Sequence, residues 1–455
     1  MHIPTLYILR QKPVNRKPLY FHTLLLCYLF GQFSWAETKD SDALTIITPH
    51  WEGITKSFDL GFKSWYKRHT NKDVQINWLS QGSRFIELEF QRVDEGIGID
   101  IYFGGGVDTY MMFAEEGYFT SYKISQHQLE QMPDQIYGIP IYDSEYQWYA
   151  ATVSSFGIMQ NEELRKKLNL PSVATWEDLT CYELLGKIGA ADPRLSGSAL
   201  MIYEIILQKY GWKNGLEIIT KIGANVKGFL SGSNLIPKHV VRGQVIYGMT
   251  IDFYAYAEMA KLGDRIKYVL PSDAAVIAPD SIGILKGAPN IEVAKKFIDF
   301  VLSESGQKLW VLSNTDPEGP KWTSPLYRPT IIPELYEILG QRCIVPNPFT
   351  QKIVPIQYDP LKGGTRWKLV RDLVGVLIID FHKHLVSTWK LINECSIPEK
   401  RKAALNVLIQ IPITEDEATK ISIDGWEDQN LRNRKLKEWS DFTRRKFRLA
   451  KELIR

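Results

Sequence analysis

The sequence predicts an α/β protein in which parallel strands alternate with helices, followed by an additional helical C-terminal region. Three observations support this fold class. Short apolar runs alternate with amphipathic stretches from Leu44 to about Ser313, and this alternation occurs twice, once on each side of an extended run. After Ser313 the chain becomes rich in proline, then charged and helical in pattern. Strands alternating with helices of these lengths are typical of a parallel sheet with helices on its faces.

The first half of the alternation is predicted from apolar runs and helical spacing. Strands are expected at 44–48, 74–79 and 99–103, the last leading into three glycines at 104–106. Helices are expected at 56–69 and 83–93. In the first of these helices, Phe58, Phe62, Trp65 and Tyr66 recur at a helical period.

The second half begins with an extended run at 146–160, rich in aromatic and β-branched residues. Strands are then expected at 187–191, 245–251 and 266–270, with helices at 198–210 and 253–262. A further extended run at 275–285 precedes an amphipathic helix at 291–302. Pro289 lies just before that helix, where proline is a common start signal.

The C-terminal region departs from this alternation. Eight prolines between residues 320 and 360 predict an irregular stretch. A long helix is expected at 367–395, and Thr414 with Glu417 forms a capping-box pattern for another. Residues 425–455 are expected to form a charged, amphipathic helix.

The N-terminal segment has the layout of a secretory signal. Four basic residues and no acidic ones precede the apolar run 21–33, and Ser34 and Ala36 supply small residues at a cleavage site. We expect export and cleavage after Ala36; retention as a membrane anchor is the alternative, although the apolar run is short for a span. Without the four basic residues the formal net charge falls from +3 to −1. A near-neutral mature chain gives no reason to expect nucleic acid as a partner.

Several sequence runs, taken in order over about residues 43–315, resemble the extracellular solute-binding proteins of ABC importers, in particular the group that includes the ferric-iron binders. They are 99–103 with 114–119, 137–140, 156–161, 170–171 with 175–179, 191–199, 281–290 and 306–307. The region 316–455 lies outside the resemblance.

The resemblance implies a two-lobed periplasmic-binding-protein fold of type II, with a ligand cleft between lobes that close about a hinge. We expect a signal peptide at 1–36, lobe 1 at 37–145 and again at 275–315, lobe 2 at 146–274, and an extension at 316–455. The receptor would be a periplasmic or extracellular monomer that delivers its ligand to a membrane permease.

The loop Ser196-Gly197-Ser198 is the strongest candidate for ligand binding. It follows a predicted strand and opens a predicted helix, so its backbone N–H groups are free and the helix dipole favours an anion. The two hydroxyls add donors, and Gly197 allows close approach. The alternative is that Ser196 is a plain helix cap.

Two further loops are expected at the cleft because they follow predicted parallel strands. Gly104, Gly105 and Gly106 could turn N–H groups toward a ligand, or could simply form a tight turn. His50 could donate a hydrogen bond, ligate a metal or be ordinary polar surface, and Trp51 could form an apolar wall.

Asp252 and Tyr254 are the remaining candidates. The resemblance places two consecutive tyrosines at this point in the ferric-iron binders, whereas this sequence has Phe253 followed by Tyr254. The triple glycine also stands where those proteins carry an acidic ligand. We therefore expect a small anion, such as a phosphate ester, phosphonate or carboxylate, with ferric iron as the alternative. Asp252 could pair with a cationic part of the ligand or cap the next helix.

The sequence contains no catalytic constellation. It lacks a P-loop, a His-Glu-x-x-His run and a Gly-x-Ser-x-Gly elbow, and the glycines at 104–106 lack the spacing of a dinucleotide site. We expect no enzymatic activity and no cofactor. Two other classes stay open, namely a ligand-sensing subunit of a membrane signalling system and a secreted enzyme that reuses the fold.

Overall fold

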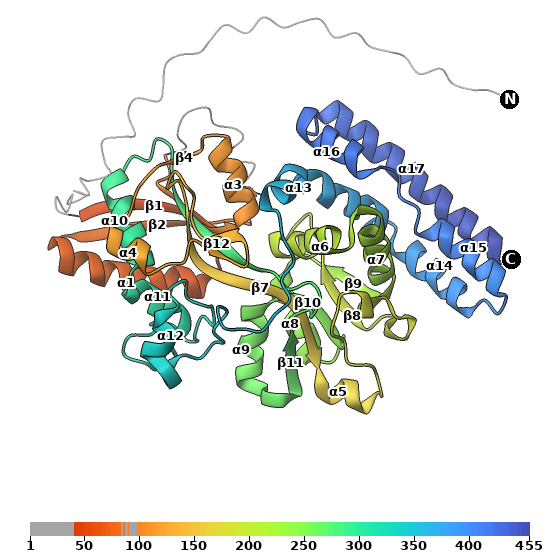
Figure 1. Ribbon diagram of the computed structural model, residues 1–455, viewed down its shortest axis with the longest axis horizontal. Coiled ribbons are helices and arrows are strands. Elements are labelled where there is room, and N and C mark those ends of the chain that lie inside the picture. Colours follow the sequence, from red (N-terminus) through yellow and green to blue (C-terminus); the bar gives the residue numbers. More distant parts are fainter. Residues whose placement is uncertain (1–40, 83–84, 87–89, 91–97) are drawn as a thin grey trace, which may run out of the picture. The chain divides into compact units, whose positions relative to one another are not determined.

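The fold contains two groups of parallel strands, which are joined by two long antiparallel strands (Figure 1). The structure is a computed structural model that describes residues 41–82, 85–86, 90 and 98–455. The strand order is β2-β1-β3-β12-β7-β10-β8-β9, with β4 and β11 attached to β12 and β7. The predicted signal segment 1–36 and most of the predicted helix 83–93 lie outside the described residues.

Lobe 1 is the half of the sheet that contains β1, β2 and β3. Strand β1 pairs in parallel with both β2 and β3, as predicted, and buried apolar side chains recur along α1. The elements of this lobe are β1 (Ser41–Thr48), α1 (Glu52–Thr70), β2 (Asp73–Ser80), β3 (Ile101–Gly106), α3 (Val107–Glu115), β4 (Phe119–Thr120), α4 (Gln126–Glu130), β5 (Gln135–Ile136), β6 (Ile139–Pro140), α10 (Ile291–Leu302), α11 (Glu304–Val311) and α12 (Glu334–Leu339).

Lobe 2 is the half that contains β8, β9 and β10, which also pair in parallel. Its elements are α5 (Glu162–Lys167), β8 (Ile188–Ala191), α6 (Gly197–Tyr210), α7 (Trp212–Asn225), β9 (Val226–Leu230), α8 (Ile236–Val241), β10 (Tyr247–Ile251), α9 (Asp252–Leu262) and β11 (Ile266–Val269). The sequence analysis did not predict α7, β9 or α8. Gly215 and Gly223 interrupt the apolar pattern of α7, but they let this helix pack closely on its neighbours.

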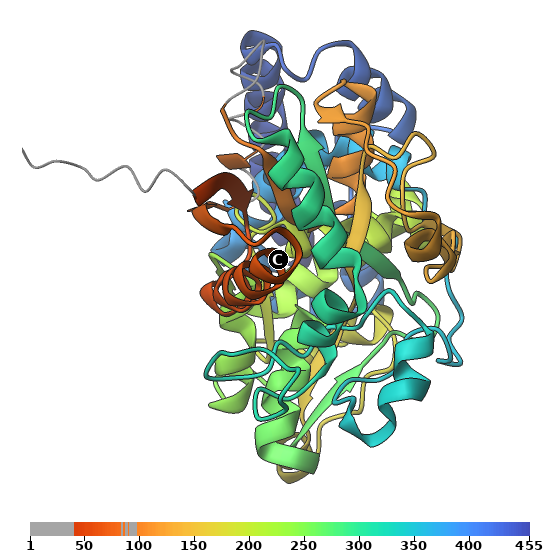
Figure 2. The same ribbon diagram turned by 90° about the vertical axis from the view of Figure 1, so that its left-hand side faces the viewer.

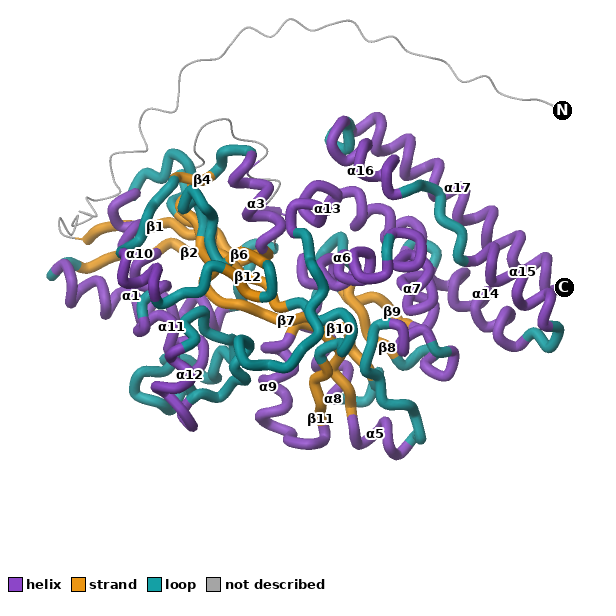
Figure 3. The backbone as a smooth tube through the Cα atoms, in the orientation of Figure 1, coloured by secondary structure: helices purple, strands orange, loops and turns teal. Residues whose placement is uncertain are grey.

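The strands β7 (Tyr149–Asn161) and β12 (Ile277–Leu285) connect the lobes, as the two predicted extended runs suggested (Figure 3). The first part of β7 pairs with β12 and its last part pairs with β10 and β11. Every residue of β7 is buried, which explains why its sequence carries no charged residue and lacks the alternation of a half-exposed strand.

The C-terminal residues divide between the two lobes. The proline-rich stretch after Ser313 packs on lobe 1, where Leu326, Ile331 and Leu335 join its core. We call residues 354–455 the C-terminal extension. It contains α13 (Pro360–Val374), a π-helical turn (Gly375–Ile379), α14 (His382–Glu394), α15 (Pro398–Leu408), α16 (Glu415–Asp424) and α17 (Gln429–Ile454). In Figure 2, lobe 1 faces the viewer and the blue helices of the extension lie behind it.

The structure corrects two boundaries of the sequence analysis. Strand β3 continues through Gly104–Gly106 rather than ending before them. The single helix expected at 367–395 is divided into α13, the π-helical turn and α14. The capping box at Thr414 and Glu417 is confirmed. Among the described helices, none combines the length and the apolarity needed to cross a bilayer.

Candidate ligand-binding site

A cavity of about 440 Å³ lies between the two lobes and is lined by both of them. Lobe 1 and its proline-rich stretch contribute Pro49, His50, Trp51, Ile54, Gly82, Gly105, Gly106, Val107, Asp108 and Arg328. Lobe 2 contributes Leu195–Ser198, Met201, Ser231–Asn234, Ile251, Phe253 and Tyr254. The joining strands supply Ser154, Phe156 and Ala278–Asp280, and the extension supplies Trp367. A cavity between two lobes can bind a small ligand.

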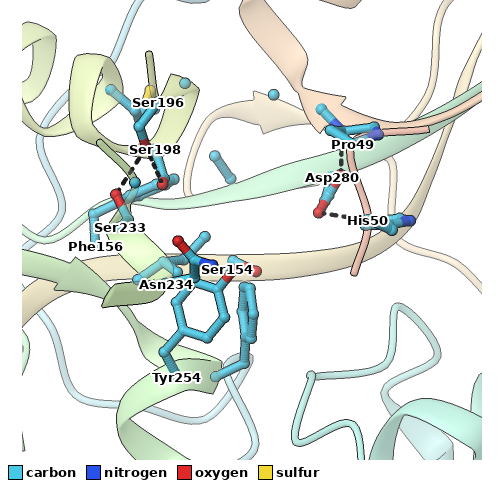
Figure 4. Close-up of a pocket in the computed structure, with 18 of the residues that line it drawn as sticks. Pro49, His50, Ser154, Phe156, Ser196, Ser198, Ser233, Asn234, Tyr254 and Asp280 are labelled. Carbon is cyan, nitrogen blue, oxygen red and sulfur yellow. Dashed lines mark hydrogen bonds and ion pairs between the residues drawn. The ribbon is translucent and has the colours of Figure 1, made fainter. Parts of the chain in front are cut away.

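A group of three serine hydroxyls forms the lobe 2 side of the cavity (Figure 4). The Oγ of Ser196 lies 2.8 Å from the Oγ of Ser233 and 3.3 Å from that of Ser198. Ser196 is also the N-cap of α6, because its Oγ accepts a hydrogen bond from the Ala199 N–H. The predicted cap is therefore confirmed, and the same side chain lines the cavity. The start of α6 offers hydroxyl donors and the positive end of a helix dipole.

The triple glycine contributes less to the cavity than the sequence suggested. Gly104 does not line it, and a Cβ at Gly104 would fall 2.6 Å from Nε2 of His50, so this glycine makes room for the His50 ring. The N–H of Gly105 donates to Oδ1 of Asp280 and is not free for a ligand. Gly106 lines the cavity as the N-cap of α3, and no side chain of the described residues caps this helix. The available lobe 1 donors are thus in the first turn of α3.

A buried arginine, Arg328, holds together the side of the cavity nearest the joining strands. Its guanidinium donates to Oδ2 of Asp280 on β12 and, at 2.9 Å, to Oγ of Ser154 on β7. It also lies 3.2 Å from Nε2 of His50 in lobe 1 and 4.5 Å from the ring of Phe253 in lobe 2. Arg328 therefore contacts both lobes and both joining strands.

The electrostatics of this group follow from burial and pairing. Burial opposes ionisation of Asp280, but the adjacent Arg328 guanidinium outweighs it and holds the pKa of this carboxyl below its usual range. Burial also lowers the pKa of His50, despite the nearby Asp280, so the imidazole is neutral at pH 7. The Arg328–Asp280 pair adds no net charge to the cavity.

Trp51 and Tyr254 line the cavity, whereas Asp252 does not. Asp252 accepts hydrogen bonds from the backbone N–H and the hydroxyl of Ser155, and from the N–H of Phe253. It thereby ties the start of α9 to β7. Burial raises the pKa of Tyr254 to about 12, which keeps its phenol protonated at pH 7. Within the described part of the chain, no three His, Cys, Asp or Glu side chains are grouped as metal ligands would be.

The C-terminal extension reaches the cavity at the start of α13. Trp367 lines it directly. Tyr358, just before α13, donates a 2.6 Å hydrogen bond to Oδ1 of Asp108 in lobe 1. The next residue, Asp359, exchanges two backbone hydrogen bonds with the side chain of Gln208 in lobe 2, of 2.8 and 2.9 Å. The extension thus bridges the two lobes at one end of the cavity.

Sequence reasoning missed Arg328, Asp280 and Asp108. Arg328 and Asp280 are isolated charges in otherwise apolar stretches, 326–332 and 274–285, and this pattern was the available signal. Asp108 follows the triple glycine directly and could have been considered with it.

Comparisons with solved structures agree with this architecture. The periplasmic binding protein AfuA from Actinobacillus pleuropneumoniae, with fructose-6-phosphate bound, superimposes with a TM-score of 0.59 at 21% identity, covering 77% of this chain and 97% of that one. Iron-bound HitA from Pseudomonas aeruginosa gives a TM-score of 0.55 at 17% identity, with 73% and 99% covered. The fold is that of a type II periplasmic binding protein.

The sequence identifies the family. The pattern that defines the bacterial extracellular solute-binding proteins matches residues 98–326, and this chain belongs to that family. The phosphoglycerate transport regulatory protein PgtC of Salmonella typhimurium is 24% identical over 307 residues, which is 66% of this chain and 72% of PgtC. An uncharacterised protein of Haemophilus influenzae is 27% identical over 255 residues, 54% of this chain and 72% of that protein. Family and fold are those of binding and transport proteins.

Proposed function

We propose that this protein captures a small anionic solute in the cavity between its lobes and delivers it to an ABC permease. The arrangement of α6 carries the proposal, because its N-terminus, with three clustered serine hydroxyls, faces the cavity from lobe 2. The uncapped first turn of α3 faces the same cavity from lobe 1. Helix N-termini favour negative charge, and charge-assisted hydrogen bonds contribute about 1.5–3 kcal/mol each.

Ferric iron fits this cavity less well. Iron requires several anionic oxygen ligands, while the aspartate nearest the histidine, Asp280, is already paired with Arg328. Phe253 stands where the first tyrosine of the iron binders is expected. The similar proteins are of both kinds, since PgtC is named for phosphoglycerate and AfuA holds fructose-6-phosphate, whereas HitA holds iron.

The proposal is tested by mass spectrometry of ligand retained through a native purification, followed by calorimetric titration. Ser196→Ala removes one hydroxyl donor and should weaken binding of a phosphate ester by about tenfold or more. Gly197→Val should weaken it further by blocking approach to the backbone. Ser125→Ala, at the cap of the exposed helix α4, is the matched control and should leave affinity unchanged. A purified protein coloured by iron, which loses its colour on Tyr254→Phe, would contradict the proposal.

A second candidate function is that of a ligand-sensing subunit of a membrane signalling system. The observation in its favour is the similarity to PgtC, whose name describes a regulatory protein. The C-terminal extension would supply a docking surface for a membrane partner. Retention of solute uptake in cells that lack a working copy of this protein would favour the sensor over the importer.

A further inference from the structure

Asp108 is a buried aspartate among the residues that line the cavity, and the proposed anion-binding arrangement does not use its carboxyl group. Its Oδ1 accepts the hydrogen bond from Tyr358, while Oδ2 has no hydrogen-bond partner among the described residues. The side chain is 1% exposed. A buried oxygen without a partner costs free energy unless a ligand supplies the missing hydrogen bond.

The C-terminal extension fixes this carboxyl in place. Tyr358 holds Oδ1, and Gly363 allows α13 to lie against it, because a Cβ there would be 2.3 Å from that oxygen. Trp367 of the same helix lines the cavity. These three residues lie beyond residue 326, where the family match ends.

The size of the cavity leaves room for more than an anionic group. A volume of about 440 Å³ corresponds to roughly fifteen water molecules, at about 30 Å³ each in the liquid. An inorganic phosphate at the start of α6 would leave most of this space unfilled. The cavity can therefore accommodate a ligand that has a body as well as an anionic end.

We infer that Asp108 forms a second polar subsite, which binds a hydroxyl group carried on the body of the anionic ligand. This inference rests on the proposed anion-binding function and names its substrate class, a hydroxylated phosphate ester or a similar hydroxylated anion. A hydroxyl group can both donate to and accept from a carboxyl group, so it satisfies Oδ2 in either protonation state.

The protonation state of Asp108, together with the pairing of Glu204, favours a hydroxyl over an ammonium group. Tyr358 is neutral, Glu204 and Asp359 are acidic, and the nearby Arg366 is already paired with Glu204. Burial raises the pKa of Asp108 to about 8 despite the Tyr358 hydrogen bond, so the carboxyl is largely protonated at pH 7. A neutral carboxyl group gives an ammonium no ionic partner in a buried site.

The test compares matched ligands by calorimetric titration. The probes are fructose 6-phosphate, 3-phosphoglycerate and glycerol 3-phosphate, with propyl phosphate as the hydroxyl-free analogue, 2-aminoethylphosphonate as the cationic one, and inorganic phosphate. We expect at least one hydroxylated ester to bind about tenfold or more tightly than propyl phosphate, the equivalent of one hydrogen bond.

Variants of Asp108 then test whether this residue causes the preference for a hydroxylated ester. Asp108→Ala should abolish that preference while leaving the affinity for propyl phosphate within about twofold. Asp108→Asn should keep most of it, because the amide retains an acceptor for Tyr358 and a donor toward the cavity. Asp273→Ala is the matched control. Asp273 also accepts a hydrogen bond from a tyrosine hydroxyl, that of Tyr210, and its other oxygen has no partner among the described residues. Unlike Asp108, it does not line the cavity.

Each outcome separates this inference from the proposed function. Equal affinity for propyl phosphate and every hydroxylated ester, or a preference that survives Asp108→Ala, would overturn the subsite and leave anion binding intact. If 2-aminoethylphosphonate binds most tightly, and Asp108→Asn abolishes that advantage, the hydroxyl subsite is overturned and Asp108 forms a cation site instead. Failure of every phosphate and phosphonate to bind would overturn the proposed function itself. If Asp108→Ala does not fold, the comparison of Asp108→Asn with Tyr358→Phe decides, since the latter should reduce the preference severalfold.

Discussion

At the scale of single residues, two buried ionisable groups at the cavity differ in how many hydrogen-bond and ion-pair partners they have. Arg328 is fully buried and reaches Asp280, Ser154 and His50. Asp108 has only the Tyr358 hydroxyl as a side-chain partner. A buried charge whose partner is removed is strongly destabilising, whereas a surface ion pair contributes little. The two residues therefore make different predictions.

Replacing Arg328 should destabilise the protein substantially. Arg328→Met leaves the Asp280 carboxylate buried without its counter-charge, and we expect a loss of about 3–5 kcal/mol in the free energy of unfolding. Arg342→Met is the control, because Arg342 makes exposed ion pairs with Asp316 and Glu318 and should cost less than about 1 kcal/mol. Urea denaturation measures both. A loss for Arg328→Met as small as that of the control would contradict the role assigned to this residue.

Asp108 should make stability depend on pH with a defined sign. The folded protein holds the Asp108 proton up to about pH 8, whereas an unfolded chain releases it near pH 4. Between these values the folded state binds more protons, so this group lowers stability as the pH rises, by about 1.4 kcal/mol per pH unit at most. The residues facing it, Tyr358, Glu204 and Asp359, modify its pKa without changing the sign.

Asp108→Asn cannot ionise and should remove this contribution. The difference in the free energy of unfolding, variant minus wild type, should therefore increase from about pH 5 to pH 8. Above about pH 9 this difference should be constant. Urea titrations at unit pH intervals measure the difference. Parallel stability curves for the two proteins would show that Asp108 has an ordinary pKa.

At the scale of elements, the position of α13 depends on two adjacent glycines. A Cβ at Gly363 would lie 2.3 Å from Oδ1 of Asp108 and 2.7 Å from the Tyr358 hydroxyl, and one at Gly364 would lie 2.9 Å from the Asp108 carbonyl oxygen. Glycine is otherwise unfavourable inside a helix, by about 1 kcal/mol relative to alanine. Close packing of α13 on α3 explains why this pair is present.

Gly363→Ala should accordingly destabilise the protein, although alanine is the better helix former. We expect a loss of about 1–3 kcal/mol from overpacking, measured as a fall in the urea midpoint. Gly228→Ala is the control, because a Cβ at Gly228 meets no atom within 4 Å and its backbone conformation is an ordinary one. A stabilising effect of Gly363→Ala would show that α13 does not pack against α3 in solution.

At the scale of the whole described molecule, the lobes are connected both by strands and by side-chain contacts. Strands β7 and β12 join them through the sheet, and the segment 358–359 joins them at the end of the cavity through Asp108 and Gln208. Opening of the cleft must stretch or break the hydrogen bonds of this segment. Ligand binding between the lobes should favour the closed arrangement, as in other hinged receptors.

Small-angle scattering should detect this motion. We expect a smaller radius of gyration with a tightly bound phosphate ester than without it. Combining Tyr358→Phe with Gln208→Ala removes two side-chain tethers and should increase the radius of the free protein, while Tyr210→Phe, away from the cavity, should not. A radius that neither the ligand nor the double variant changes would count against a hinged receptor.

The sequence by itself determined most of the secondary structure and the resemblance to the family. Apolar periodicity is a local property, so runs such as 44–48, 245–251 and 291–302 predicted β1, β10 and α10 closely. The Ser196–Ser198 loop was also predictable, because a helix start after a parallel strand has a local signature. The two lobes followed from the resemblance, and the assigned boundaries between them remain a prediction.

Only the tertiary structure decided which groups meet at the cavity. Arg328 lies 48 residues from Asp280 and 278 from His50, and Tyr358 lies 250 residues from Asp108. No local pattern specifies such pairs, because they depend on how β7, β12, the proline-rich stretch and the extension pack against the two lobes. The same long-range packing lets the N–H of Gly105 donate to Asp280 and lets Asp252 accept from Ser155. Burial and pairing, which set the charge of each group, exist only once the chain has folded.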